Sequence, residues 1–186
     1  MNKENSRWLL WGAVGLASAA AAAIPLLPVL RRRAMRVTTI LKKDHRMVSA
    51  MIATIQAMPK VNRKAIKTLV EQLYSNVIVH ETAEDEVVYS MIRNVGSEDA
   101  RSAIDRAYRE QETVKTMIEE LRTLDPLGAR FDQRLQEFKE TITDHANLEE
   151  SSVFTAIEDR VSEDRQTVMG ERLHLRKKEL HHQVAA

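Results

Sequence analysis

The sequence predicts an all-α protein, and three observations carry this prediction. The chain of 186 residues has only 5 Gly and 4 Pro, and it is rich in Ala, Glu, Lys, Arg, Leu and Met, which favour helices. Apolar residues recur with a period of about 3.6 over long stretches, and no segment shows the alternation of a strand. An internal repeat, offset by about 65 residues, relates two halves of the chain. We therefore expect an up-down-up-down four-helix bundle with an N-terminal transmembrane helix and an extra C-terminal helix.

The first expected element is a membrane anchor. Residues 8–30 form an uncharged apolar run that would be about 35 Å long as a helix, enough to cross a hydrocarbon core of about 30 Å. Six basic residues follow the run, whereas only Lys3 and Arg7 precede it. The positive-inside rule then predicts a single-pass protein that contacts the lipid bilayer through residues 8–30 and keeps its bundle on the cytoplasmic side. The alternative is export after signal-peptide cleavage, because residues 17–19 read Ala-Ser-Ala.

The remaining helices follow from their start and stop signals. Pro59 ends the first helix, because the residue before a proline is disfavoured in a helix. Gly96 ends the second, Ser97 caps the third, and Pro126 takes the first helical position of the fourth. The expected bundle helices span residues 33–58, 62–94, 97–124 and 126–160, and a polar fifth helix spans 162–182. The expected organisation is an anchor with a basic flank (1–33), a bundle (34–160), and a C-terminal helix and tail (161–186).

The composition excludes several classes of site. Without cysteine, the chain has no disulfide, thiol nucleophile, iron–sulfur cluster or cysteine-based zinc site. The formal net charge of +1 is nearly balanced, which argues against a nucleic-acid partner bound through phosphate neutralisation. Any bound metal must accept nitrogen and oxygen ligands.

The repeat places candidate metal ligands in its second helix. His80 is followed by Glu84, and His145 by Glu149, so each pair points the same way from a helix at positions i and i+4. Both pairs interrupt apolar stripes, where an unpaired carboxylate would cost several kcal/mol. These stripes continue to Met91 in the second helix and to Ala156 in the fourth. Metal coordination removes the cost of burying these carboxylates.

The first helix of each half carries one further position. His45 in the first half aligns with Gln111 in the second. Three imidazoles and two carboxylates suit iron, with manganese or zinc as alternatives. Two carboxylates that can bridge favour a pair of metals, which leaves open coordination positions for dioxygen or another diatomic ligand. We expect two iron ions, and a site with one iron is the alternative.

The order His45, His80-x-x-x-Glu84, His145-x-x-x-Glu149 resembles the hemerythrin-like, or HHE cation-binding, domains over about residues 36–160. The resemblance implies a four-helix bundle holding a non-haem di-iron centre bridged by the two glutamates. Members bind dioxygen, respond to oxygen, iron or redox state, react with nitric oxide or peroxide, or help repair iron centres.

Gln111 departs from the family pattern, because it stands where the family normally supplies another histidine. A neutral amide is a poor iron ligand, so we expect one metal to be held more weakly, or completed by water, Glu110 or Glu112. Glu81 is a further candidate for a weak or indirect contact with the metal.

The neighbours of the ligands have less specific interpretations. Tyr89 and Phe154 follow the two glutamates by five residues and are expected to pack in the core, although Tyr89 could donate a hydrogen bond to a bound oxygen species. Asp44 and Asp144 precede histidines, and each is either an acceptor for a ring N–H or a surface residue. Glu150 is expected to be solvated.

The predicted function is that of a membrane-anchored non-haem iron protein that binds or senses dioxygen, nitric oxide or iron, and a binding protein is favoured over an enzyme. Two alternatives remain. One is a di-iron oxidoreductase acting on peroxide or nitric oxide. The other is a structural bundle whose metal site is no longer used.

Overall fold

The computed structural model describes residues 26–95 and 98–184 and divides the chain into two compact units, Met1–Ala34 and Met35–Ala186. The described part of the first unit is helix α2 (Leu26–Ala34), which carries three of the predicted basic residues. Most of the predicted membrane span, 8–30, lies outside the described residues. Within the described ranges, no helix is both long enough and apolar enough to cross a bilayer.

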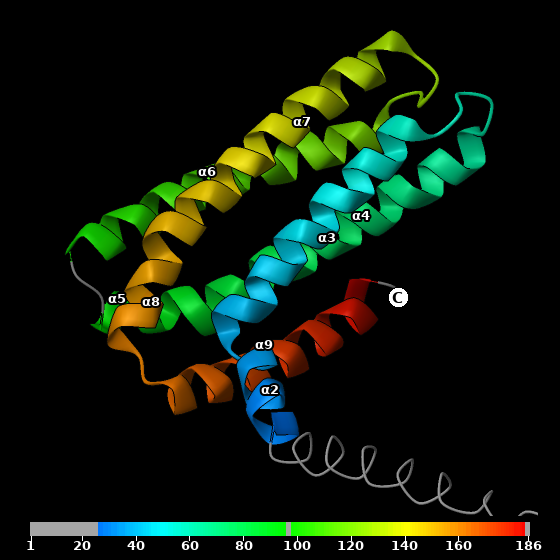
Figure 1. Ribbon diagram of the computed structural model, residues 1–186. Coiled ribbons are helices and arrows are strands. Elements are labelled where there is room, and N and C mark those ends of the chain that lie inside the picture. The colour runs from blue at the N-terminus through cyan, green and yellow to red at the C-terminus, as the bar shows by residue number, and fades with distance from the viewer. Residues whose placement is uncertain (1–25, 96–97, 185–186) are drawn as a thin grey trace, which may run out of the picture. The chain divides into compact units, whose positions relative to one another are not determined.

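The second unit is a helical bundle, and the described residues contain no strand. Figure 1 shows its long helices running side by side. The first half comprises α3 (Val37–Ala57), α4 (Arg63–Glu84), the π-helical turn η1 (Asp85–Tyr89) and α5 (Ser90–Val95). The second half comprises α6 (Glu98–Thr123), α7 (Ala129–Leu148), the π-helical turn η2 (Glu149–Val153) and α8 (Phe154–Arg160), and α9 (Glu163–Val184) follows.

Most helix limits agree with the start and stop signals, with two corrections. The first bundle helix begins at Val37 rather than at residue 33, because Arg36 has an extended backbone that separates it from α2. Pro126 is not the first residue of α7. The Asp125 side chain accepts the Leu127 backbone N–H at 3.0 Å, which closes a turn and delays the helix to Ala129. The predicted signals Gly96 and Ser97 lie outside the described residues.

The two π-helical turns were not predicted, and they change which residues reach the core. In η1 the Ser90 N–H bonds to the Asp85 carbonyl five residues earlier, and η2 repeats this geometry. The extra residue rotates the following helix. Ile92 and Ile157 are therefore buried, whereas Met91 and Ala156, which we expected on the core stripe, are only partly buried.

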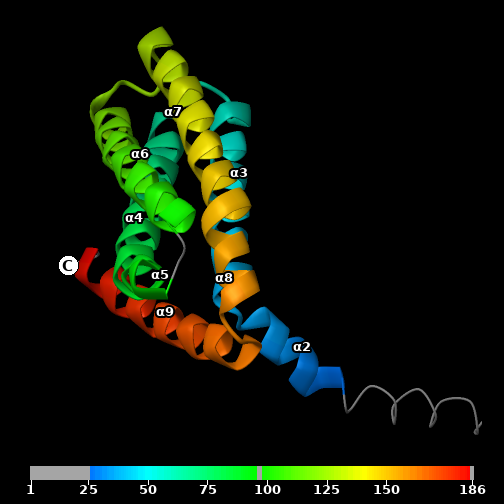
Figure 2. The same cartoon turned by 90° about the vertical axis from the view of Figure 1, so that its left-hand side faces the viewer.

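The core consists of two apolar clusters with the candidate ligands between them. One cluster lies toward the α3–α4 and α6–α7 connections and includes Ile55, Ile66 and Phe131. The other includes Phe154 and the buried side of α9, through Met169, Leu173 and Leu180. Figures 1 and 2 show α9 crossing the bundle at the end occupied by α5 and α8. A layer of polar side chains separates the two clusters.

Candidate metal centre

The five residues predicted as ligands meet in the polar layer. His45 comes from α3, His80 and Glu84 from α4, and His145 from α7, while Glu149 begins η2. Glu84 and Glu149 are fully buried and the imidazoles nearly so. The structure thus brings together residues that are up to about a hundred positions apart, and their role as metal ligands remains a prediction.

Their donor atoms form two groups of three that share one carboxylate. Nitrogen and oxygen atoms of His45, His80 and Glu149 lie within 4.8 Å of one another, and so do those of Glu84, His145 and Glu149. Glu149 belongs to both groups, so its two oxygens can face two cations. This arrangement suits a pair of ions bridged by a carboxylate.

The chemistry of the donor atoms fits a cation. Nε2 of each imidazole, both oxygens of Glu84, and Oε2 of Glu149 are buried without a hydrogen-bond partner. Buried polar atoms in folded proteins are normally paired, and leaving one unpaired costs about 1–3 kcal/mol. Several unpaired atoms around one point are explained by an ion that binds them all. Nitrogen and carboxylate donors without sulfur suit iron, manganese or zinc.

Carboxylates lie beside the three imidazoles and accept hydrogen bonds from two of them. A carboxylate oxygen lies near each Nδ1 atom: Glu150 at 2.8 Å from His45, Asp44 at 3.3 Å from His80, and Glu110 at 3.5 Å from His145. An acceptor at Nδ1 favours the tautomer that leaves Nε2 free, which is the usual arrangement around metal-bound histidines. The rings of His45 and His80 therefore present Nε2 to the glutamates between the two clusters. The longer contact between Glu110 and His145 is not a hydrogen bond.

Two of these carboxylates, Glu150 and Glu110, lie beside an imidazole, which the sequence did not predict. We expected Glu150 to be solvated, yet its carboxylate accepts a hydrogen bond from His45. Asp44 accepts from the ring N–H of His80, which was one of its two interpretations. Asp144 is exposed, which was the other interpretation. Glu110 lies next to Gln111 just as Asp44 lies next to His45. An acidic residue thus precedes the aligned position in both halves, and this regularity was the sequence signal for Glu110.

The two buried glutamates have opposite electrostatic environments without a metal. Burial and then the charge of Glu149 raise the pKa of Glu84 well above its ordinary value. Burial also acts to raise the pKa of Glu149, but the charges of His145 and His45 outweigh it and lower that pKa. The protonated form of Glu84 is therefore favoured, in a position where a cation would replace the proton.

Gln111 lies at the site but contacts it through a tyrosine. Its side chain is 2% exposed, and its Nε2 donates to the Tyr89 hydroxyl at 3.4 Å. That hydroxyl donates to Oε1 of Glu149. Tyr89 is packed in the core, as predicted, and the π-helical turn directs its hydroxyl to the shared carboxylate. Gln111 thus acts on the site through this hydrogen-bonded chain.

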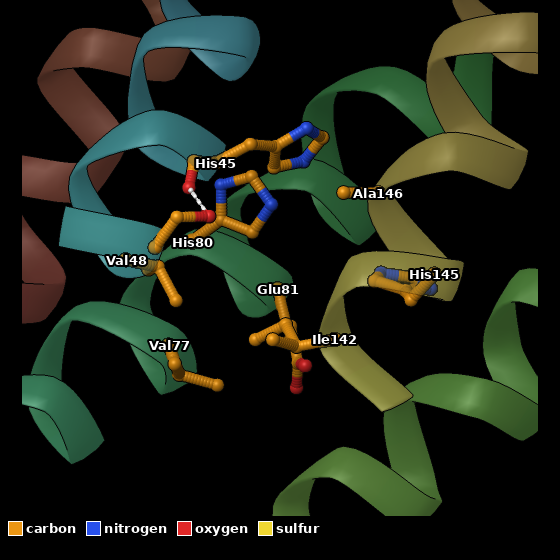
Figure 3. Close-up of a pocket in the computed structure, with 9 residues that line it drawn as sticks. His45, Val48, Val77, His80, Glu81, Ile142, His145 and Ala146 are labelled. Atoms are coloured by element: carbon orange, nitrogen blue, oxygen red, sulfur yellow. Dashed lines mark hydrogen bonds between the residues drawn. The ribbon is translucent and has the colours of Figure 1, made fainter. Parts of the chain in front are cut away.

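Of the other two candidates for a weak contact with the metal, one is buried and one is exposed. Glu81 is buried with both carboxylate oxygens unpaired, whereas Glu112 is 76% exposed and pairs with Lys115 at 3.0 Å. Glu81 lines a cavity of about 20 Å³ beside the imidazoles (Figure 3). The cavity is bounded by His45, Val48, Ser49, Val77, His80, Glu81, Ile142, His145 and Ala146. This volume accommodates about one water molecule or a small diatomic ligand.

The fold and the donor cluster define a metal-binding helical bundle, and comparison with known proteins identifies its family. The hemerythrin HHE cation binding domain matches residues 36–157. The chain therefore belongs to the hemerythrin HHE cation-binding family. A crystal structure of an HHE cation binding domain-containing protein from Mycobacterium kansasii has the same fold, with a TM-score of 0.69 and 20% identity over 80% of this chain and 88% of that one.

One curated relative has a different description. A protein described as a DNA nickase, from Nostoc sp. (strain PCC 7120 / SAG 25.82 / UTEX 2576), is 25% identical over 130 residues. The match covers 70% of this chain but 36% of that protein. The chain thus spans about a third of the length of this relative.

Proposed function

We propose that this protein is a non-haem iron protein that binds or senses dioxygen, nitric oxide or iron. One observation supports the proposal above the others: buried nitrogen and oxygen atoms of both halves converge without hydrogen-bond partners. His45, His80, Glu84, His145 and Glu149 would hold the metal, with Glu149 shared between two ions. When bound, iron supplies reversible ligand binding and one-electron redox chemistry.

The chain's own residues provide the conditions that such a site needs. The apolar clusters on either side exclude bulk water, which strengthens electrostatic interactions at the site. Asp44 and Glu150 accept hydrogen bonds from Nδ1 of His80 and His45, which directs Nε2 of these two rings inward. Five protein ligands do not fill two six-coordinate ions, and the cavity beside Glu81 offers space for an external ligand.

The partner and location also belong to this proposal. We propose that residues 8–30 anchor the protein in a membrane with the bundle on the cytoplasmic side, because they form an uncharged run followed by basic residues. Nucleic acid is not among the proposed partners, since the net charge is nearly balanced. Fractionation of cells that express the full chain tests the anchor, and recovery in the exported fraction would favour the signal-peptide alternative.

Metal analysis with optical spectroscopy tests the metal centre. The full chain would be purified with iron and exposed to air, alongside variants H80A and H145A. H174A is the matched control, because His174 is exposed on α9. About two irons per chain and a charge-transfer band, both lost in H80A and H145A but kept in H174A, would support the proposal. Less than one metal per chain in the unsubstituted protein, with zinc and manganese also failing to bind, would overturn it.

A further inference from the structure

The C-terminal helix α9 lies beyond residues 36–157, which match the family. It nevertheless packs against the end of the bundle occupied by α5 and α8 (Figure 2). Its buried residues follow helical spacing, from Met169 and Gly170 through Leu173 to Leu180. Lys177 falls on this same stripe, four residues after Leu173 and three before Leu180. A lysine on the buried side of a helix requires a partner for its charge.

The partner of Lys177 is a carboxylate that orients a metal ligand. Its Nζ lies 2.6 Å from Oδ2 of Asp44, and its side chain is 15% exposed. The same oxygen lies 3.3 Å from Nδ1 of His80. Lys177, Asp44 and His80 therefore form a continuous chain from α9 through α3 to α4. The helix that follows the residues matched by the family therefore reaches the metal site through one carboxylate.

The residue before Lys177 makes a second contact with a ligand-bearing segment. The Arg176 guanidinium donates two hydrogen bonds to Glu86, Nε to Oε2 at 2.5 Å and Nη2 to Oε1 at 3.0 Å. Glu86 belongs to η1, the π-helical turn that follows Glu84. Consecutive residues of α9 thus hold the segment next to Glu84 and the carboxylate next to His80.

Close packing at Gly170 fixes the position of α9 along the bundle. A Cβ atom at this position would lie 1.8 Å from the Met35 carbonyl oxygen, which no side chain could tolerate without a backbone shift. Gly170 is seven residues before Lys177, two helical turns along the same face. This contact therefore places Lys177 opposite Asp44.

We propose that Lys177 is a positioning residue of the metal centre, and that docking of α9 and binding of metal stabilise each other. This inference rests on the proposed function. Lys177 holds Asp44, and Asp44 holds the His80 ring with Nε2 toward Glu84. Because coupling between two binding events is reciprocal, a metal that requires this geometry must also strengthen the docking of α9.

The first test compares metal affinities of the full chain and three variants. K177M keeps the length and apolar character of the side chain on a buried stripe, K177R keeps the charge, and K178M removes the neighbouring charge at an exposed position. Cobalt(II) is the probe, because competition with a chelator gives its affinity and its visible spectrum reports ligand geometry. We expect K177M to lose about 10- to 100-fold in affinity, as is typical for partners of metal-bound histidines, with an altered spectrum.

The control variants decide how this result is interpreted. K178M is expected to match the unsubstituted protein, and K177R to retain most of its affinity. In D44N the carboxylate is absent, so adding K177M to D44N is expected to cause little further loss. Equal affinities and spectra for K177M and K178M would overturn the inference while leaving the proposed function intact. Failure of the unsubstituted chain to bind cobalt(II), zinc or iron would overturn both.

Hydrogen exchange of α9 tests the reciprocal effect. Adding zinc to the metal-free full chain is expected to slow amide exchange between residues 170 and 182, and to slow it much less in K177M. Equal protection of α9 with and without bound zinc would overturn the coupling, because docking would then be independent of the metal.

Discussion

Replacing Glu84 by glutamine tests the electrostatics of the metal-free site. Burial and the charge of Glu149 raise the pKa of Glu84 well above the ordinary value of 4.5. In the unfolded chain this carboxyl loses its proton near pH 4.5, whereas in the folded chain it keeps the proton to higher pH. The contribution of Glu84 to stability therefore falls as the pH rises above 4.5.

The magnitude follows from proton linkage. One proton held by the folded state but not by the unfolded state lowers the free energy of unfolding by about 1.4 kcal/mol per pH unit. Between pH 5.5 and 6.5, the metal-free protein with Glu84 is thus expected to lose up to about 1.4 kcal/mol relative to E84Q. The buried amide of E84Q has its own cost, but that cost is the same at both pH values.

Urea unfolding of chelator-treated protein at the two pH values measures this difference. E86Q is the matched control. The hydrogen bonds from Arg176 lower the pKa of Glu86, so this carboxylate is ionised in both folded and unfolded chains across the interval. E86Q is therefore expected to change stability equally at pH 5.5 and 6.5. Parallel pH dependence for E84Q and the unsubstituted protein would refute the reasoning, since Glu84 would then be charged in the metal-free fold.

Three further predictions concern the same region. Because a cation replaces the proton on Glu84, zinc binding at pH 6.5 is expected to release protons, which calorimetry in buffers of different ionisation enthalpy detects; a buffer-independent enthalpy would contradict this. G170A, whose Cβ would collide with Met35, is expected to lower the free energy of unfolding of the metal-free protein by about 1–3 kcal/mol in urea titrations, and an unchanged midpoint would contradict the packing. Q111H alone is expected to gain little metal affinity, because it loses the amide donor to Tyr89. The double variant Q111H/Y89F is expected to gain about tenfold in metal affinity from the added imidazole. Chelator competition with cobalt(II) compares the two variants, and an equal gain in both would show that Tyr89 does not restrain this position.

Local sequence signals predicted the helices and the residues that meet at the site. Pro59 acts on the residue directly before it, so the end of the first bundle helix can be identified without the fold. The pairs formed by His80 and Glu84 and by His145 and Glu149 depend only on helical spacing. Their repetition indicated that the pairs share one site.

The π-helical turns could not be predicted from the same signals. Each begins at or directly after a buried glutamate, and it shifts the following residues by one position. Periodicity assumes a constant number of residues per turn, so it placed Met91 on the core side where Ile92 is buried. The position of the inserted residue is determined by the packing of the two apolar clusters, which helical periodicity does not report.

Contacts between distant segments were also beyond the sequence signals. Lys177 and Asp44 are separated by 133 positions in the sequence, and no local rule relates them. Glu150 follows a predicted ligand, but the direction of its side chain depends on where α3 places His45. Such contacts are determined by tertiary packing, and they are the ones that orient the imidazoles.

The departure at Gln111 is explained by comparing the two halves of the repeat. The lone histidine of the first half, His45, stacks on Phe154 with ring centroids 5.7 Å apart and planes inclined by 12°. Gln111, the aligned residue of the second half, donates a hydrogen bond to Tyr89. Tyr89 belongs to the first half and aligns with Phe154 in the repeat. An amide needs an oxygen acceptor, which tyrosine provides and phenylalanine does not. Glutamine in place of histidine and tyrosine in place of phenylalanine are therefore linked by one hydrogen bond. The tyrosine hydroxyl accepts from Gln111 and also donates to Glu149. Gln111 stabilises the hydrogen bond to the carboxylate shared by both donor groups, so its presence is compatible with a working metal centre.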